Sequence, residues 1–347
     1  MELQSYQEII QYLDKKNRDK HLLLGNGFSM AYDTTIFSYN ALNKFIEKIE
    51  DPLLQKLFEI VNTKNFEVVM QQLDNFCQLA EEFSSDAELK VKIQAASDAL
   101  KRSLIDAVKE LHPEHVFQVP EEKSKACADF LGDYLKTNGH VFTTNYDILL
   151  YWVLMRNIDM FPSAIDGFGR TVEDSDEYVE DYEEGDLEWG KYKEEQNVHY
   201  LHGTLPLFDA GVSITKEEYD TQDYLLKKIE KRMDNKEYPI FVTSGNGKEK
   251  LTHIMHNQYL TYCYEKLCSL EGSLVTFGFN FGEYDHHIID AINQAAKQGK
   301  RAPTKLWSIY IGVYSESDKK HIESIVDKFK CKVNLYDAKT AKVWGEN

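Results

Sequence analysis

Cysteine is scarce in this 347-residue sequence, and its spacing excludes two classes of protein. Only five cysteines occur, and no two of them form a C-x-x-C pair. A disulfide framework uses cysteines in even numbers, and a zinc ribbon is built from C-x-x-C pairs. We therefore expect reduced, mostly buried thiols and a cytoplasmic protein.

Long apolar runs are also absent. No stretch approaches the ~20 consecutive apolar residues of a membrane-spanning helix, so we expect no membrane association. The first 20 residues instead predict an amphipathic helix, with Leu3, Ile9, Ile10 and Leu13 near one face. They lack the apolar core and the small-residue cleavage site of a signal peptide.

Positive charge is in deficit, because the formal net charge is −18. Part of the negative charge is concentrated in an acidic segment, residues 172–196. Such a segment repels a polyphosphate backbone, so direct nucleic-acid binding is not expected. We expect a solvated loop there; a docking surface for a basic partner is the alternative.

The apolar pattern predicts an α/β protein. Hydrophobic residues make up 42% of the chain, enough for one large domain over residues 1–347. The final third alternates strands with helices through short connections, which is typical of a parallel sheet with helices on both faces. Residues 37–136 have a helical pattern and are predicted to form an insertion. Predicted strands lie at 21–25, 140–147, 197–203, 238–247, 273–281, 305–314 and 331–338.

Glycine follows the first predicted strand, in Gly25-Asn26-Gly27-Phe28-Ser29. Ligands of open parallel sheets bind beyond the carboxyl ends of the strands. Gly25 and Gly27 would let a diphosphate approach the backbone, and the next helix would direct its N-terminus at the anion. The spacing is neither G-x-G-x-x-G nor a P-loop. A tight strand–turn–helix connection without a ligand is the alternative.

Polar side chains follow two further strands. Asn145, within Thr143–Asp147, can hold a ribose hydroxyl or orient a water; an Asx turn that caps the next helix is the alternative. His202 precedes Gly203. Imidazole is the natural proton acceptor near neutral pH, although a lone histidine is more often structural.

The segment after the strand at 273–281 is rich in glycine and histidine. Gly278 and Gly282 leave room for a flat ligand ring. His286 and His287 are adjacent, so on a helix they point in different directions and do not form an H-x-x-x-H metal pair. The sequence therefore predicts no metal site.

Taken in order, these motifs resemble those of the sirtuin family. Residues 25–29 resemble its G-A-G-x-S loop, and Thr144-Asn145-Tyr146-Asp147 resembles its T-Q-N-x-D segment. His202-Gly203 is similar to its catalytic His-Gly, and Gly278-Phe279-Asn280 lies where its late G-[TS]-S loop would occur. The chain most resembles the prokaryotic Sir2-like group, and within it the DUF4917 family.

The resemblance implies a Rossmann-like fold that binds NAD. Classical sirtuins are protein deacylases with a zinc module of two C-x-x-C pairs, which this chain lacks. Zinc-free Sir2-like proteins of bacterial antiphage defence are NAD glycohydrolases, and the departures here favour that branch. Asn26 and Thr144 stand where the family has a small residue and glutamine.

The resemblance also implies a role for each motif in a zinc-independent NAD nucleosidase. Asn145 and His202 would be catalytic, with Asp147 orienting one of them. A non-catalytic NAD or ADP-ribose sensor, or a subunit of a larger defence complex, is the alternative. Control by homo-oligomerisation or by a partner protein is expected. The predicted NAD-binding residues are Gly25, Asn26, Gly27, Phe28, Ser29, Asp33, Thr144, Gly278, Phe279 and Asn280.

Overall fold

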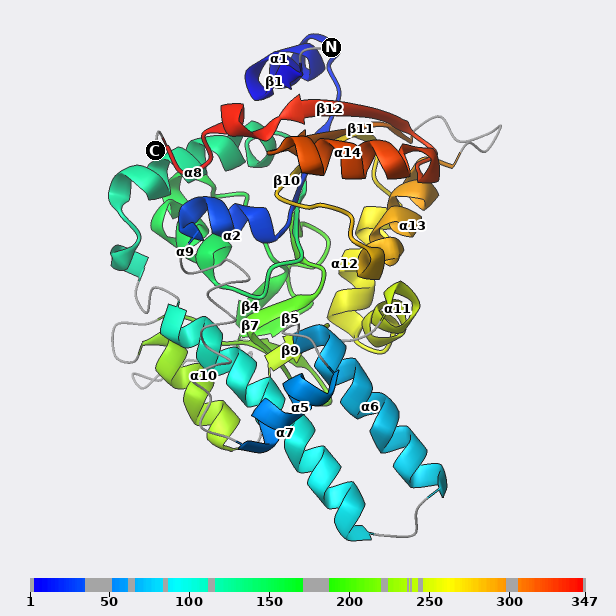
Figure 1. Cartoon of the computed structure of the whole chain (residues 1–347). Coiled ribbons are helices and arrows are strands. Elements are labelled where there is room, and N and C mark those ends of the chain that lie inside the picture. Colours follow the sequence, from blue (N-terminus) through cyan, green and yellow to red (C-terminus); the bar gives the residue numbers. More distant parts are fainter. Residues whose placement is uncertain are drawn as a thin grey trace, which may run out of the picture.

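Seven parallel strands form the central sheet of the computed structural model (Figure 1). The structure describes residues 3–34, 52–61, 66–83, 87–111, 116–170, 187–219, 224–235, 237, 239–242, 246–297 and 305–345. The strands, in order across the sheet, are β1 (Gln4–Ser5), β12 (Lys332–Asp337), β11 (Leu306–Val313), β10 (Gly272–Phe277), β2 (Lys20–Leu24), β3 (Val141–Thr143) and β6 (Val198–Tyr200).

The strand order is that of a doubly wound dinucleotide-binding sheet. Without the two-residue edge strand β1, the order across the sheet is β6-β3-β2-β10-β11-β12. Numbered along the chain, this is the order 3-2-1-4-5-6 of such sheets. All five residues of the interior strand β2 are buried, as expected for a strand covered on both faces. The predicted Rossmann-like α/β fold is therefore confirmed.

Helices cover both faces of the sheet. In Figure 1, α8 (Glu121–Leu135) and α9 (Leu149–Arg156) lie on one side of β10, and α12 (Gln258–Cys268) and α13 (His286–Ala295) lie on the other. The predicted first helix is α1 (Tyr6–Lys15), whose Tyr6 hydroxyl donates to Asp133 of α8 at 2.8 Å. Among the described residues, the other helices outside the insertion are α2 (Asn26–Tyr32), α10 (Leu225–Asp234), α11 (Gly247–Met255) and α14 (Glu316–Ile325).

A second, antiparallel sheet was not expected. Its strands, in order, are β4 (Phe168–Arg170), β5 (Leu187–Trp189), β8 (Ile214–Lys216), β7 (Gly203–Asp209) and β9 (Pro239–Phe241). The prediction that residues 238–247 add a strand to the parallel sheet is wrong, because β9 pairs with β7 here. A short apolar run indicates a strand but does not specify its partner.

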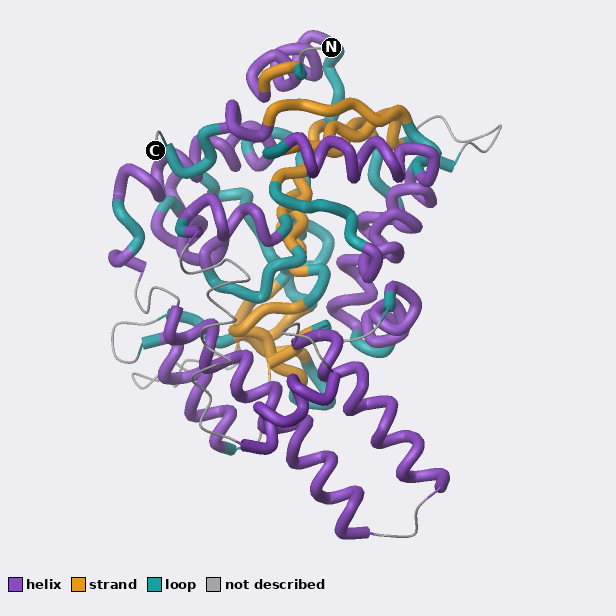
Figure 2. The backbone as a smooth tube through the Cα atoms, in the orientation of Figure 1, coloured by secondary structure: helices purple, strands orange, loops and turns teal. Residues whose placement is uncertain are grey.

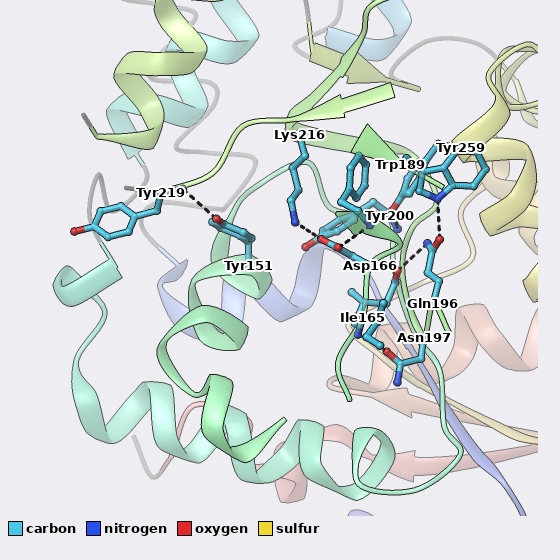
Figure 3. Close-up of polar contacts among 12 residues, drawn as sticks. Tyr151, Ile165, Asp166, Trp189, Gln196, Asn197, Tyr200, Lys216, Tyr219 and Tyr259 are labelled. Carbon is cyan, nitrogen blue, oxygen red and sulfur yellow. Dashed lines mark hydrogen bonds and ion pairs between the residues drawn. The ribbon is translucent and has the colours of Figure 1, made fainter. Parts of the chain in front are cut away.

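Polar side chains fix the region where the two sheets meet (Figure 3). Lys216 Nζ lies 2.5 Å from Asp166 Oδ2, and both side chains are largely buried. The backbone N–H of Ile165 donates to Asn197 Oδ1 at 2.8 Å. Buried ion pairs need such satisfied surroundings, so this junction has a defined geometry.

Three helices of the predicted insertion form a separate unit. These are α5 (Pro52–Val61), α6 (Phe66–Phe83) and α7 (Ala87–Leu111), of which α6 and α7 extend away from the sheets in Figure 2. Their own apolar cluster includes Phe58, Leu73 and Leu100. Helix α8 also falls within 37–136, but its buried side chains, such as Leu131, join the main core. Residues 37–51 of the predicted insertion, and 172–186 of the acidic segment, lie outside the described residues.

Short 3-10 helices complete the described elements: η1 (Val116–Gln118), η2 (Ile158–Met160), η3 (Glu283–Asp285), η4 (Val326–Lys328) and η5 (Ala338–Ala341). All five cysteines are among the described residues, and all are free thiols. Within the described ranges, no helix has both the length and the apolar character needed to cross a membrane.

Replacing Gly203 with alanine should strongly destabilise the fold. Gly203 begins β7 with φ +76°, and a Cβ there would lie 1.9 Å from the carbonyl oxygen of Ile240. Gly211 also has a positive φ, +83°, but no atom lies within 4 Å of the point that a Cβ would occupy there. We expect G203A to lower the free energy of unfolding by about 3 kcal/mol and G211A by about 1 kcal/mol. Equal losses in urea unfolding would show that the close approach at Gly203 is unimportant.

Candidate functional site

The glycines after β2 pack against the loop after β10. The N–H of Gly27 donates to the carbonyl oxygen of Gly278 at 2.9 Å. A Cβ at Gly25 would lie 2.6 Å from that oxygen, and one at Gly27 would lie 2.5 Å from Gly278 Cα. The loop after β10 therefore lies where the sequence predicted that a diphosphate would approach Gly25 and Gly27. The N–H of Gly27 already has an acceptor in this loop.

The two phenylalanines among the predicted NAD-binding residues are core side chains. The Phe28 ring packs 4.9 Å from Trp344, and the Phe279 ring packs edge-on 4.7 Å from Phe281. Both phenylalanines are buried, whereas Asn26 is exposed at the first turn of α2. These aromatic rings therefore hold the two loops together by packing.

The remaining predicted NAD-binding positions lie around the same edge of the sheet. The N–H of Thr144 donates to the carbonyl oxygen of Leu24 at 3.1 Å, which joins the ends of β3 and β2. Asn280 is exposed, and its carbonyl oxygen accepts from His321 Nε2 at 2.9 Å. Asp33 ends α2. The predicted residues thus come from three neighbouring strand ends.

A buried hydrogen-bond chain joins the loops after β2 and β3. Ser29 Oγ donates to Asp147 Oδ2 at 2.5 Å, and Asn145 Nδ2 donates to Ser29 Oγ at 2.9 Å. The other oxygen of Asp147 accepts from the N–H of Leu149 at 3.0 Å. Ser29 is fully buried, and Asn145 and Asp147 are each 8% exposed.

This chain fixes the orientation of the Asn145 carboxamide. An ionised carboxylate only accepts hydrogen bonds, so the single hydroxyl proton of Ser29 goes to Asp147. The Ser29 oxygen can then only accept, and it must face the NH₂ of Asn145. Among the described residues, none donates to Asn145 Oδ1. Asn145 therefore presents an acceptor oxygen, which is suited to a hydroxyl group or a water.

His202 adjoins this chain through the neighbouring loop. Thr204 Oγ1 donates to the carbonyl oxygens of Tyr146 and Asp147, at 3.0 and 3.2 Å. The Tyr146 ring is stacked on the His202 imidazole with centroids 6.5 Å apart. The ends of β3 and β6 are thereby held together, with His202 only 3% exposed.

A second histidine contacts His202. The Nε2 atoms of His202 and His287 lie 2.8 Å apart, and both rings are buried. Burial lowers the pKa of His202 well below its usual value, and the His287 ring and the Lys250 cation act in the same direction. Burial also lowers the pKa of His287 to about 3. Both imidazoles are therefore neutral at pH 7.

The sequence reasoning missed this group. His202, His287 and Asp285 place ligand atoms within 4.8 Å of one another, a spacing that also suits a metal ion. However, buried Lys250 places Nζ 3.2 Å from Asp285 Oδ1, so the four side chains are already neutral as a set. A divalent cation would add uncompensated charge to this buried site. The sequence did show His202 after a strand end, but His287, which contacts it, lies 85 residues further along the chain.

The fold and the site define a Rossmann-like α/β protein with buried polar groups at the carboxyl edge of its sheet. The chain belongs to the family described as a domain of unknown function, DUF4917, whose model matches residues 22–344. No curated protein matches the sequence significantly.

Proposed function

We propose that this protein hydrolyses the bond between nicotinamide and ribose in NAD. The observation that supports this most is the buried chain from Asp147 through Ser29 to Asn145, beside a neutral His202. It lies at the edge where sheets of this strand order bind dinucleotides. The resemblance of the same residues to the Sir2-like motifs further supports the proposal.

The groups present suit a dissociative substitution at the ribose C1′ carbon. The C1′–N bond breaks, and its electron pair neutralises the nicotinamide ring as the ring leaves. A water oxygen bonds to C1′, and its proton passes to the imidazole of His202. Asn145 Oδ1 would hold that water or a ribose hydroxyl in place, because Ser29 fixes the carboxamide.

We further propose that the activity serves antiphage defence, since loss of cellular NAD stops an infected cell. Such a hydrolase must be restrained, so control by self-association or by a partner protein is part of this proposal. The helices α5, α6 and α7 have their own core and are the first surface to test for such contacts.

The proposal is tested by incubating the purified chain with NAD and separating the products by chromatography. We expect nicotinamide and ADP-ribose in equal amounts, without added metal and in the presence of a chelator. Intact NAD after long incubation at high protein concentration, with and without cell extract from infected bacteria, would contradict hydrolysis.

An NAD or ADP-ribose sensor is a second candidate. The observation that favours it is the burial of the site, since Asn145 and His202 are only 8% and 3% exposed. A site closed in this way suits a protein that changes shape when a nucleotide enters. Tight NAD binding by calorimetry, with no product formed, would select the sensor.

A further inference from the structure

His287 lies behind His202 and holds one of its two ring nitrogens. The Nε2–Nε2 distance of 2.8 Å is that of a hydrogen bond, with the ring planes inclined at 27°. A hydrogen bond between two neutral imidazoles needs a proton on one nitrogen and a lone pair on the other. One of the two Nε2 atoms must therefore carry a proton, and the other must offer its lone pair.

The surroundings keep this pair neutral. Lys250 Nζ is buried and bonded to Asp285 Oδ1, and its positive charge lowers the pKa of both histidines. His286 acts on His287 in the same direction. In the resting protein an imidazolium within the pair is thus disfavoured by burial and by two basic neighbours, while the carboxylate of Asp285 is already paired with Lys250. The proton that His202 accepts from the attacking water is therefore held only transiently.

We propose that His287 is a positioning residue that sets the tautomer of His202. His202 donates from Nε2 to Nε2 of His287, which leaves the lone pair of His202 on Nδ1. Among the described residues, none bonds to Nδ1 of His202, so this atom is available to a substrate. This inference rests on the proposed function, because a lone pair at Nδ1 is what proton removal requires.

The assignment has a consequence for the outer nitrogen of His287. His287 Nδ1 is buried and has no hydrogen-bond partner among the described residues. If His287 accepts at Nε2, its proton must be at this unpartnered Nδ1 atom. Buried polar groups without a partner are rare, and a catalytic role is one of the explanations for them.

The first test measures the tautomers directly and does not depend on enzyme activity. Nitrogen-15 NMR of the full chain, labelled at histidine, should show the proton of His202 on Nε2 and that of His287 on Nδ1 at pH 7.5. In H287A, the His202 signals should move to a mixture of tautomers. The reverse assignment, an imidazolium in the pair, or stoichiometric zinc bound to both rings would overturn the proposal.

The second test uses turnover of NAD. We expect H287A to lower kcat about 100-fold with KM changed less than about threefold, and the acid limb of kcat/KM to move to higher pH. H287Q returns a polar atom near the Nε2 position and should recover at least about tenfold of the loss. H256A is the matched control, because His256 is an exposed histidine at the end of α11.

The two tests separate the possible failures. Wild-type kcat in H287A would overturn the positioning role even if NAD is the substrate. If the wild-type chain does not cleave NAD, the proposed function fails, whereas the NMR result still decides the tautomers. If H287A does not fold, the turnover of H287Q tests the positioning role, and the wild-type NMR spectra test the tautomers.

Discussion

Alanine at Asn145 or at His202 is expected to lower the rate of nicotinamide release by about 10²- to 10⁴-fold. Asn145 loses the acceptor oxygen that Ser29 and Asp147 orient, and His202 loses the proton acceptor. Neither side chain supplies a large part of the apolar core, so both variants should remain folded. The measurement is steady-state turnover of NAD, with circular dichroism and thermal unfolding to establish the folded state.

Matched controls exist elsewhere in the chain. N334A removes an asparagine on β12, and H256A removes an exposed histidine at the end of α11. Both should retain wild-type turnover. Full activity in N145A and H202A would mean that catalysis takes place elsewhere or uses other residues. Loss of activity in the controls as well would point to a general effect on the fold.

Acidification below pH 6.5 is expected to destabilise the protein steeply, because three histidines, in β2, in β6 and just before β3, are held neutral. Burial lowers the pKa of His21 to about 4 and that of His140 to about 4. His199 is fully buried, and its pKa also lies well below the usual value. Neighbouring cations and rings, Lys266 among them, act on His140 and His199 in the same direction.

Hydrogen bonds explain why each ring resists a second proton. The Trp189 indole only donates, so Gln196 Oε1 faces it at 2.9 Å and Gln196 Nε2 faces His199 Nδ1 at 3.3 Å (Figure 3 shows the Trp189–Gln196 bond). His199 therefore accepts at Nδ1 and donates from Nε2 to His140 Nδ1 at 3.0 Å. The backbone N–H of His140 donates to His21 Nδ1 at 3.0 Å. A second proton on any of these three rings would place its N–H opposite another hydrogen-bond donor.

The sign of the effect follows from linkage. The unfolded chain binds these protons near pH 6.5 and the folded chain only near pH 4, so stability is lost as pH falls between those values. For a pKa of about 4 in the folded state, each histidine costs about 2 kcal/mol at pH 5 relative to pH 7.5. His21 and His140 together thus give about 4 kcal/mol. Urea unfolding across this pH range measures the loss.

A variant separates this effect from general acid denaturation. H140Q removes one titrating ring, so its stability should depend less on pH between 6.5 and 5, even if it is less stable at pH 7.5. H256A should follow the wild-type pH dependence. A wild-type free energy of unfolding that stays constant from pH 7.5 to pH 5 would contradict the neutral histidine cluster.

The sequence was informative about strands whose faces are both buried. Leu22, Leu23 and Leu24 form an uninterrupted apolar run before Gly25, and this run lies in the interior strand β2. The second sheet was not predicted, because its strands are mostly three residues long and pair in an antiparallel arrangement. Pairing of such short strands depends on tertiary contacts, such as Lys216 with Asp166, that no local pattern reports.

The candidate site was predicted in part. The polar residues at strand ends were located from the sequence because parallel strands bring their carboxyl ends to one edge. The sequence did not indicate that Gly25 and Gly27 pack against Gly278, because a glycine needed for a ligand and one needed for the chain look alike. The contact of His202 with His287 likewise depends on how α13 packs, which local periodicity does not specify.

The most direct test of the central claim is a crystal structure of the H202A variant with intact NAD. We expect the nicotinamide ribose next to Asn145 Oδ1, with C1′ about 3 to 4 Å from the space vacated by the imidazole. NAD bound with its nicotinamide end away from both residues, or at another surface of the protein, would contradict it.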